Sequence, residues 1–226
     1  MRKKELTILI ILTIVISNLV FLFGYKLVLY NQNFYENEFE TNKIYEKYNK
    51  SFVDEQHKEV MEYLVTSKPI ITSNEFSKQD KQHLRDVESL MKRIDYYSYF
   101  LVILILLIFV YLHLFYKKIK DKVFSKAVYL SSCLNLIIVG IIYLLSLNFE
   151  WFFIKFHELS FNNDLWMMDP RVDLLVNLYP EQFWVHAVSK VLISILIISV
   201  IFGVIGYLGN YFISKHKFKS QVVSKP

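Results

Sequence analysis

The chain has 226 residues, of which 54% are hydrophobic and 17% aromatic, and its formal net charge is +5. This apolar fraction is too high for an ordinary soluble domain and indicates a small integral membrane protein. The basic residues gather beside apolar runs rather than along one polar face, so membrane orientation explains the charge better than nucleic-acid binding. The single cysteine, Cys133, excludes an internal disulfide and a Cys/His zinc or redox cluster.

Four apolar stretches are long enough to cross a hydrocarbon core of about 30 Å, which needs about 20 helical residues. They cover residues 6–30, 96–116, 127–147 and 188–212. The first follows a basic "MRKK" start, as in a signal peptide, but its apolar run is much longer than the usual one of about 7 to 15 residues. No small-residue cleavage site follows it. We therefore expect this helix to be retained, which gives four spans.

The charges of the connecting segments predict the topology. Residues 117–126 hold five lysines and one aspartate, and residues 213–226 hold four lysines and no acid. By the positive-inside rule these segments and residues 1–5 should be cytoplasmic. Residues 31–95 hold thirteen acidic and ten basic residues, and residues 148–187 hold six acidic and two basic residues. Both of these segments should be extracytoplasmic, and both termini cytoplasmic.

The first extracytoplasmic segment should contain two short amphipathic helices. In residues 51–64, apolar side chains recur at near-helical spacing from Val53 to Leu64. The dipeptide Lys68-Pro69 should end this helix before the strand-like sequence "PIITS".

The second amphipathic helix is expected over residues 77–94 and should run into the second span. An apolar stripe extends along it from Leu84 to Met91, and Ser77 followed by Asp80 fits a capping box. The predicted fold is therefore an all-α integral membrane protein. A single membrane domain, residues 1–226, would comprise four transmembrane helices and an extracytoplasmic cap of short amphipathic helices.

The glycines indicate packing rather than chemistry. All five lie in predicted spans: Gly24, Gly140, Gly203, Gly206 and Gly209. Small residues let membrane helices approach each other closely, so we expect close helix packing at these positions. The sequence holds no nucleophile elbow, phosphate-binding loop or dinucleotide fingerprint.

Two of the six histidines stand out as candidates for chemistry. His113 and His216 fall on the cytoplasmic side, His186 begins the fourth span, and His57 lies on the predicted polar side of its helix. The remaining two are His83 and His157, one from each extracytoplasmic segment.

Imidazole is the side chain best matched to proton transfer near neutral pH. His83 is three residues from Asp86, one helical turn away, and His157 follows a run of aromatic residues at the expected membrane interface. The simpler interpretation is that both are interfacial surface residues. A metal site is a further alternative, but no H-x-x-x-H or H-E-x-x-H spacing supports it. Nucleophilic catalysis would need a residue such as Ser160, which nothing marks.

Two motifs resemble a known family of bacterial membrane proteins. They are "FHELSFNNDLWMMDPRVDLLVNLYPEQFW", residues 156–184, and "SKQDKQHLRDVESL", residues 77–90. With the four-span layout, they are similar to the lipoprotein intramolecular transacylases. The resemblance implies an enzyme of the bacterial cytoplasmic membrane, active at the outer leaflet. It would move the sn-2 acyl chain of an S-diacylglyceryl cysteine to the α-amino group of that cysteine.

The resemblance also implies roles for individual residues. The two functional histidines of the family correspond to His157, here the expected general base, and His83, its expected partner. Candidates for orienting the imidazoles are Asp86, Glu158 and Asp164. Candidates for stabilising developing charge are Arg85, Asn162 and Asn163. Candidates for the neck that receives acyl chains, or for interface anchoring, are Trp151, Trp166 and Trp184.

The expected partners are diacylglyceryl-modified lipoproteins and membrane lipids. We expect no cofactor, metal or nucleic acid, and a monomer. The rival interpretation is a non-catalytic membrane scaffold or sensor whose outer loops bind a partner, with the motifs serving folding alone.

Overall fold

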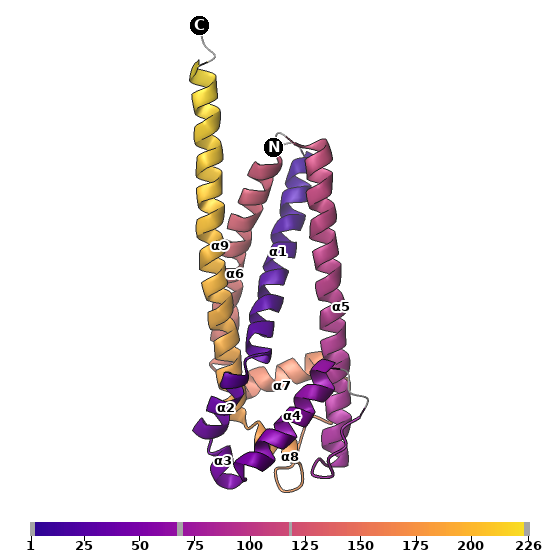
Figure 1. The fold of residues 1–226 in the computed structure, drawn as a ribbon. Helices are drawn as coiled ribbons and strands as arrows, with labels where there is room; N and C mark the ends of the chain where they lie inside the picture. The colour runs from indigo at the N-terminus through magenta and orange to yellow at the C-terminus, as the bar shows by residue number, and fades with distance from the viewer. Residues whose placement is uncertain (1–2, 67–69, 118, 224–226) are drawn as a thin grey trace. The chain divides into compact units, whose positions relative to one another are not determined.

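The computed structural model describes residues 3–66, 70–117 and 119–223, with side chains as far as Lys215. All regular structure in these residues is helical (Figure 1). The helices are α1 (Lys3–Leu29), α2 (Gln32–Thr41), α3 (Ile44–Lys47), α4 (Lys50–Thr66), α5 (Lys78–Phe115), α6 (Lys120–Ser146), α7 (Phe149–Ser160), α8 (Leu174–Leu178) and α9 (Glu181–Val223).

Four helices, α1, α5, α6 and α9, are long and apolar enough to cross a membrane. They cover the four predicted apolar stretches except residues 30, 116 and 147, which lie just beyond the helix ends. The predicted fold class, an all-helical integral membrane protein, is confirmed. Many of their apolar side chains are exposed, including Leu107, Leu114 and Leu144, each more than 60% accessible. Such side chains suit contact with lipid rather than water. Helix α5, which begins at Lys78, combines the amphipathic helix expected before the second span and the span itself in one unbroken helix.

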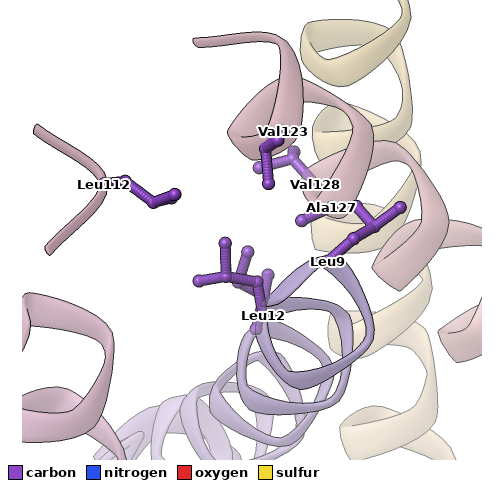
Figure 2. Packing of buried hydrophobic residues seen from close by; sticks show 7 residues of the cluster. Leu9, Leu12, Leu112, Val123, Ala127 and Val128 are labelled. Atoms are coloured by element: carbon purple, nitrogen blue, oxygen red, sulfur yellow. The ribbon is translucent and has the colours of Figure 1, made fainter. Parts of the chain in front are cut away.

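The chain divides into two compact units. The first comprises α1 up to Leu27, α5 from Tyr97, α6 up to Tyr143 and α9 from Val191. Figure 2 shows part of its core, where Leu9 and Leu12 of α1 approach Ala127 of α6. Leu12 and Ala127 are almost completely buried. Three helices, α1, α5 and α6, therefore contribute to one apolar cluster.

The close packing expected at glycines is confirmed for α9. A Cβ atom on Gly206 would lie 2.5 Å from the backbone nitrogen of Tyr129 in α6, and one on Gly209 would lie 2.6 Å from the Ser125 hydroxyl. The expectation is wrong for Gly140, where a Cβ would meet nothing within 4 Å. At Gly206 the backbones of α6 and α9 approach each other closely, because the glycine has no side chain.

Substitution of Gly206 by alanine should destabilise the protein by about 1 to 3 kcal/mol, because overpacking against a backbone forces the helices apart. Gly140→Ala is the matched control. It should be neutral or stabilising by up to about 1 kcal/mol, since alanine favours helix more than glycine does. Thermal unfolding of both variants in detergent measures the difference. Equal melting temperatures for Gly206→Ala and the wild type would contradict the close approach.

The second unit comprises the chain from Val28 to Tyr96 and from Leu144 to Lys190. The two amphipathic helices expected here are present as α4 and the first part of α5. The strand-like interpretation of "PIITS" is wrong for residues 70–73, which have irregular backbone, while Lys68-Pro69 lies outside the described residues. The physical reason is local: the backbone N–H groups of Thr72 and Ser73 donate to the carboxylate of Glu59 in α4 rather than to a neighbouring strand.

Candidate functional site

The second unit brings the two candidate histidines together. His83 lies on α5 and His157 on α7, and their ring centroids are 6.1 Å apart with an angle of 32° between the planes. Each side chain is only 7% exposed. Both rings therefore lie in one largely dry environment, and the interpretation of the two as surface residues does not hold.

A backbone hydrogen bond selects the tautomer of His157. Its Nδ1 lies 2.8 Å from the carbonyl oxygen of Phe153, one helical turn earlier. A carbonyl can only accept, so Nδ1 carries the hydrogen and donates it. In the neutral ring the lone pair is then on Nε2. Burial lowers the pKa of His157, although the bond to Phe153 opposes this, so the ring is neutral at pH 7.

His157 is enclosed by aromatic rings. Its centroid is 4.1 Å from that of Phe153 and 5.7 Å from that of Phe161. The indole of Trp166 stacks on it at 4.9 Å, with 29° between the planes. These apolar rings are the source of the desolvation that lowers the pKa.

His83 has a different environment. Its ring and that of Phe161 pack edge to face, with 5.2 Å between the centroids. Its Nδ1 is buried without a hydrogen-bond partner in the described part of the chain. The pKa of His83 is lowered to about 4, chiefly by burial and also by the neighbouring His157, while Asp86 opposes the shift. His83 is therefore also neutral at pH 7.

The predicted capping box forms, and it also joins the two sequence motifs. The Ser77 N–H donates to the Asp80 carboxylate and the Asp80 N–H donates to the Ser77 hydroxyl, both at 3.0 Å. The carboxylate, which is completely buried, accepts in addition from the N–H groups of Leu174 (2.9 Å) and Leu175 (3.3 Å). Asp80 thus ties the start of α5 to the start of α8.

A second buried carboxylate, that of Asp173, completes this connection. It accepts from the Ser77 hydroxyl at 2.5 Å and from the Asp169 N–H at 2.7 Å. Sequence reasoning did not single out Asp173, and it treated Asp80 only as a cap. Charged groups with several hydrogen bonds hold backbone segments in a defined geometry, so these two residues fix the relative placement of the motifs.

The loop after α7 is held to α5 by two further side chains. Gln79 donates through its Nε2 to the carbonyl oxygens of Leu165 (3.1 Å) and Met167 (2.8 Å). The Asn163 side-chain amide donates to the Asp86 carboxylate at 3.0 Å. Asp86 and Asn163, both candidates from the sequence, therefore bond to each other near the histidines.

Four other candidates are exposed: Arg85, Asn162, Asp164 and Glu158. Glu158 pairs with Lys155 at 2.6 Å on the surface of α7. In the described residues no hydrogen bond joins any of the four to either histidine. The structure therefore offers no support for Glu158 or Asp164 as an orienting residue.

The three tryptophans have separate environments. Only Trp166 contacts a candidate histidine. Trp151 on α7 is 45% exposed and Trp184 on α9 is 40% exposed. The indole N–H of Trp184 donates to the carbonyl oxygen of Tyr179 at 3.0 Å.

His57 was wrongly placed on a polar face. It is 2% exposed, its Nδ1 lies 2.8 Å from the Tyr179 hydroxyl, and its ring packs on Tyr35 at 4.4 Å. Burial lowers its pKa to about 4, with Asp54 opposing. The aromatic residues that cover His57 come from α2 and from the segment before α9, so the period of its own helix could not reveal them.

The described residues contain no group of three or more histidine, cysteine, aspartate or glutamate side chains placed to hold a metal ion. The geometry is instead that of two neutral imidazoles in an apolar enclosure. Such a pair can accept and donate protons at neutral pH.

Solved structures share this fold. The membrane integral lipoprotein intramolecular transacylase Lit from Bacillus cereus is 21% identical with a TM-score of 0.74, over 97% of this chain and 100% of that one. A variant of the same protein with a histidine replaced by arginine is 22% identical with a TM-score of 0.76, over 96% of this chain and 95% of that one. No curated protein matches the chain.

The sequence model of one family matches residues 8–184, and this family is described as lipoprotein intramolecular transacylase Lit. The chain belongs to the Lit family. The match includes both motifs, residues 77–90 and 156–184, and therefore both histidines and the carboxylates that connect their segments. Membership makes the protein a transacylase by family, with lipoproteins as the family's substrates, and confirms the predicted resemblance.

The buried histidines of this Lit family member predict a pH dependence of stability. The unfolded chain binds a proton at His83 near pH 6.5, whereas the folded protein does so only near pH 4. Stability is therefore unaffected by His83 above pH 6.5 and is lost progressively as the pH falls from about 6.5 to about 4. At about 1.4 kcal/mol per pKa unit the loss should reach about 3 kcal/mol. Melting temperatures measured from pH 7.5 to pH 4 should fall less steeply for His83→Asn than for the wild type; parallel curves would contradict this.

Proposed function

We propose that this protein moves the sn-2 acyl chain of a diacylglyceryl-modified lipoprotein to the α-amino group of its N-terminal cysteine. The observation that carries the proposal is the buried pair of neutral imidazoles, 6.1 Å apart, held by residues of both motifs. The reaction must take a proton from an amine and return one to an alkoxide. Two neutral imidazoles suit this because each can accept or donate a proton at neutral pH.

His157 is the general base in this mechanism. Its Nε2 lone pair accepts a proton from the α-amino nitrogen as that nitrogen attacks the ester carbonyl carbon. A tetrahedral intermediate forms, and its collapse breaks the bond between the acyl carbon and the sn-2 oxygen. The proton on Nε2 then passes to the departing alkoxide, so His157 returns to its neutral form. The product is an amide and a free sn-2 hydroxyl, and no water is consumed.

His83 is the hydrogen-bond donor to the oxyanion. A buried N–H without a partner is rarer in proteins than an acceptor without one. The hydrogen of neutral His83 is therefore assigned to Nε2, with the lone pair on the unpartnered Nδ1. A neutral imidazole can donate its N–H to developing negative charge. The lowered pKa of His83 also keeps it from becoming an imidazolium, which would repel His157 when that ring is protonated.

The intramolecular nature of the reaction supplies much of the rate. The ester and the amine belong to one substrate molecule, so holding them in contact gives a high effective concentration. An acyl-enzyme nucleophile is then unnecessary. The enzyme's contribution is orientation, proton transfer and exclusion of water from the ester.

We propose that the site lies at the outer leaflet of the cytoplasmic membrane. Both segments that carry histidines are connectors, one between the first and second spans and one between the third and fourth, and so emerge on the same side. The lysines of residues 117–126 favour a cytoplasmic position for the opposite side. The exposed indoles of Trp151 and Trp184 suit the headgroup layer.

Mass spectrometry of a reporter lipoprotein tests the function. The protein is expressed in a strain that otherwise leaves the diacylglyceryl form, and the N-terminal lipopeptide is fragmented, because acyl migration itself conserves mass. We expect an N-acyl fragment with an S-monoacylglyceryl group. An unchanged diacylglyceryl pattern, with folded protein in the membrane, would overturn the proposal and favour the non-catalytic scaffold.

A further inference from the structure

Trp166 has a place in the site that its expected role as an interface anchor does not explain. Its indole is half-buried and stacks on the ring of His157 at 4.9 Å, nearly parallel at 29°. A second constraint on that ring is the hydrogen bond that Nδ1 donates to the Phe153 carbonyl oxygen. The stacked indole fixes the plane of the imidazole, and the hydrogen bond fixes its rotation within that plane. The direction of the Nε2 lone pair is therefore determined.

The backbone on both sides of Trp166 is fastened to α5. Gln79 donates to the carbonyl oxygen of Leu165, immediately before the tryptophan, and to that of Met167, immediately after it. The Leu165 N–H is bound in turn by the side-chain oxygen of Asn163 at 3.0 Å. An indole that only anchored the protein in lipid would not need its own peptide groups held by a helix that also carries His83.

We propose that Trp166 is a positioning residue, which, fastened by Gln79, holds the imidazole of His157 in the plane required for proton transfer and shields it from water. This inference rests on the proposed function and assigns it a further residue. Preorganised groups lose little orientation entropy during reaction, and a displacement of about 1 Å can reduce the rate on the order of 100-fold.

The charged groups around His157 are few. The neighbouring titratable ring is that of His83 on α5, where Asp86 bonds to Asn163. On α7 itself, Glu158 pairs with Lys155 at the surface. In the loop, Asp164 is exposed. Shielding by aromatic rings is therefore the main influence on the protonation of His157, in line with burial as the first cause of its lowered pKa.

Three variants test the inference. Trp166→Leu removes the stacked ring and Trp166→Phe retains an aromatic face. Leu159→Ala is the control, because Leu159 is 88% exposed and lies on the same helix as His157. We expect kcat to fall on the order of 10- to 100-fold in Trp166→Leu, with a smaller fall in Trp166→Phe and no comparable change in Leu159→Ala.

The pH profile separates positioning from a merely structural role. Without the indole, water reaches the ring and the pKa of His157 should rise toward 6.5, so the acid limb of activity should move to higher pH in Trp166→Leu. The same shift should appear in NMR titration of the enzyme with labelled histidine, where the His157 signal is assigned by its loss in His157→Asn.

The two ways of failing are distinguishable. If Trp166→Leu folds with an unchanged titration of His157 and retains wild-type kcat, the positioning role is wrong while the transacylase function stands. If the wild type yields no N-acyl product, the proposed function is wrong. A changed titration with no measurable kcat effect would likewise overturn the catalytic relevance of Trp166.

Discussion

Replacement of His157 by glutamine should reduce the rate of N-acyl lipoprotein formation by about 10² to 10⁴, the usual contribution of a general base. Glutamine has similar length and can still donate to the Phe153 carbonyl, but it has no basic nitrogen to accept the proton of the attacking amine. His83→Gln should cost less, because a side-chain amide retains an N–H donor for the oxyanion. His83→Ala removes the donor and should cost on the order of 100-fold or more.

The order of the rate losses among these variants distinguishes the role of His157 from that of His83. Initial rates with a reporter lipoprotein, normalised to folded protein, should decrease from wild type to His83→Gln, then to His83→Ala and His157→Gln. The control is His113→Asn on α5, whose ring lies near Lys120 and is outside the second unit. If His157→Gln kept near-wild-type rates while His83→Gln did not, the roles assigned to the two rings would be reversed. Full activity in both would remove histidine from the mechanism.

The arrangement of helices was accessible from the sequence because it depends on local patterns. Four apolar runs predicted four spans, and the spacing from Ser77 to Asp80 predicted a cap that the structure confirms. Short-range hydrogen bonds and hydropathy are properties of neighbouring residues. His83 and His157 were singled out by the membrane side expected for each histidine, and the motif resemblance then gave them a joint role.

What the sequence could not predict depends on long-range partners. Asp80 completes its set of bonds with Leu174, 94 residues later, and His57 meets Tyr179, 122 residues later. A polar residue on a helix is assigned to the solvent side by periodicity unless its distant partner is known, which is why His57 was misplaced. Likewise Gly140 and Gly206 look equivalent in the sequence, yet only Gly206 is crossed by another backbone.

Removal of the Asp80 carboxylate should have the largest effect on stability. In Asp80→Ala the N–H of Leu174, which is buried, loses its acceptor, and those of Ser77 and Leu175 lose theirs as well. An unsatisfied buried donor costs about 1 to 3 kcal/mol and bonds to a charged group are at the strong end, so we expect a loss of about 3 to 5 kcal/mol. Glu55→Ala, at an exposed position of α4, is the control and should change stability by less than about 0.5 kcal/mol.

The consequence for function follows from where these bonds lie. Asp80 caps the start of the helix that carries His83 and holds the segment that follows Trp166. Its loss should therefore loosen the enclosure of both imidazoles before the spans themselves separate. Hydrogen exchange of Asp80→Ala should therefore increase first in residues 77–84 and 161–178, while α6 stays protected, and transacylation should fall at temperatures where the spans remain folded. A variant that unfolded in one step, with equal exchange in α6 and in these segments, would contradict this, because the carboxylate would then support the whole bundle rather than the site.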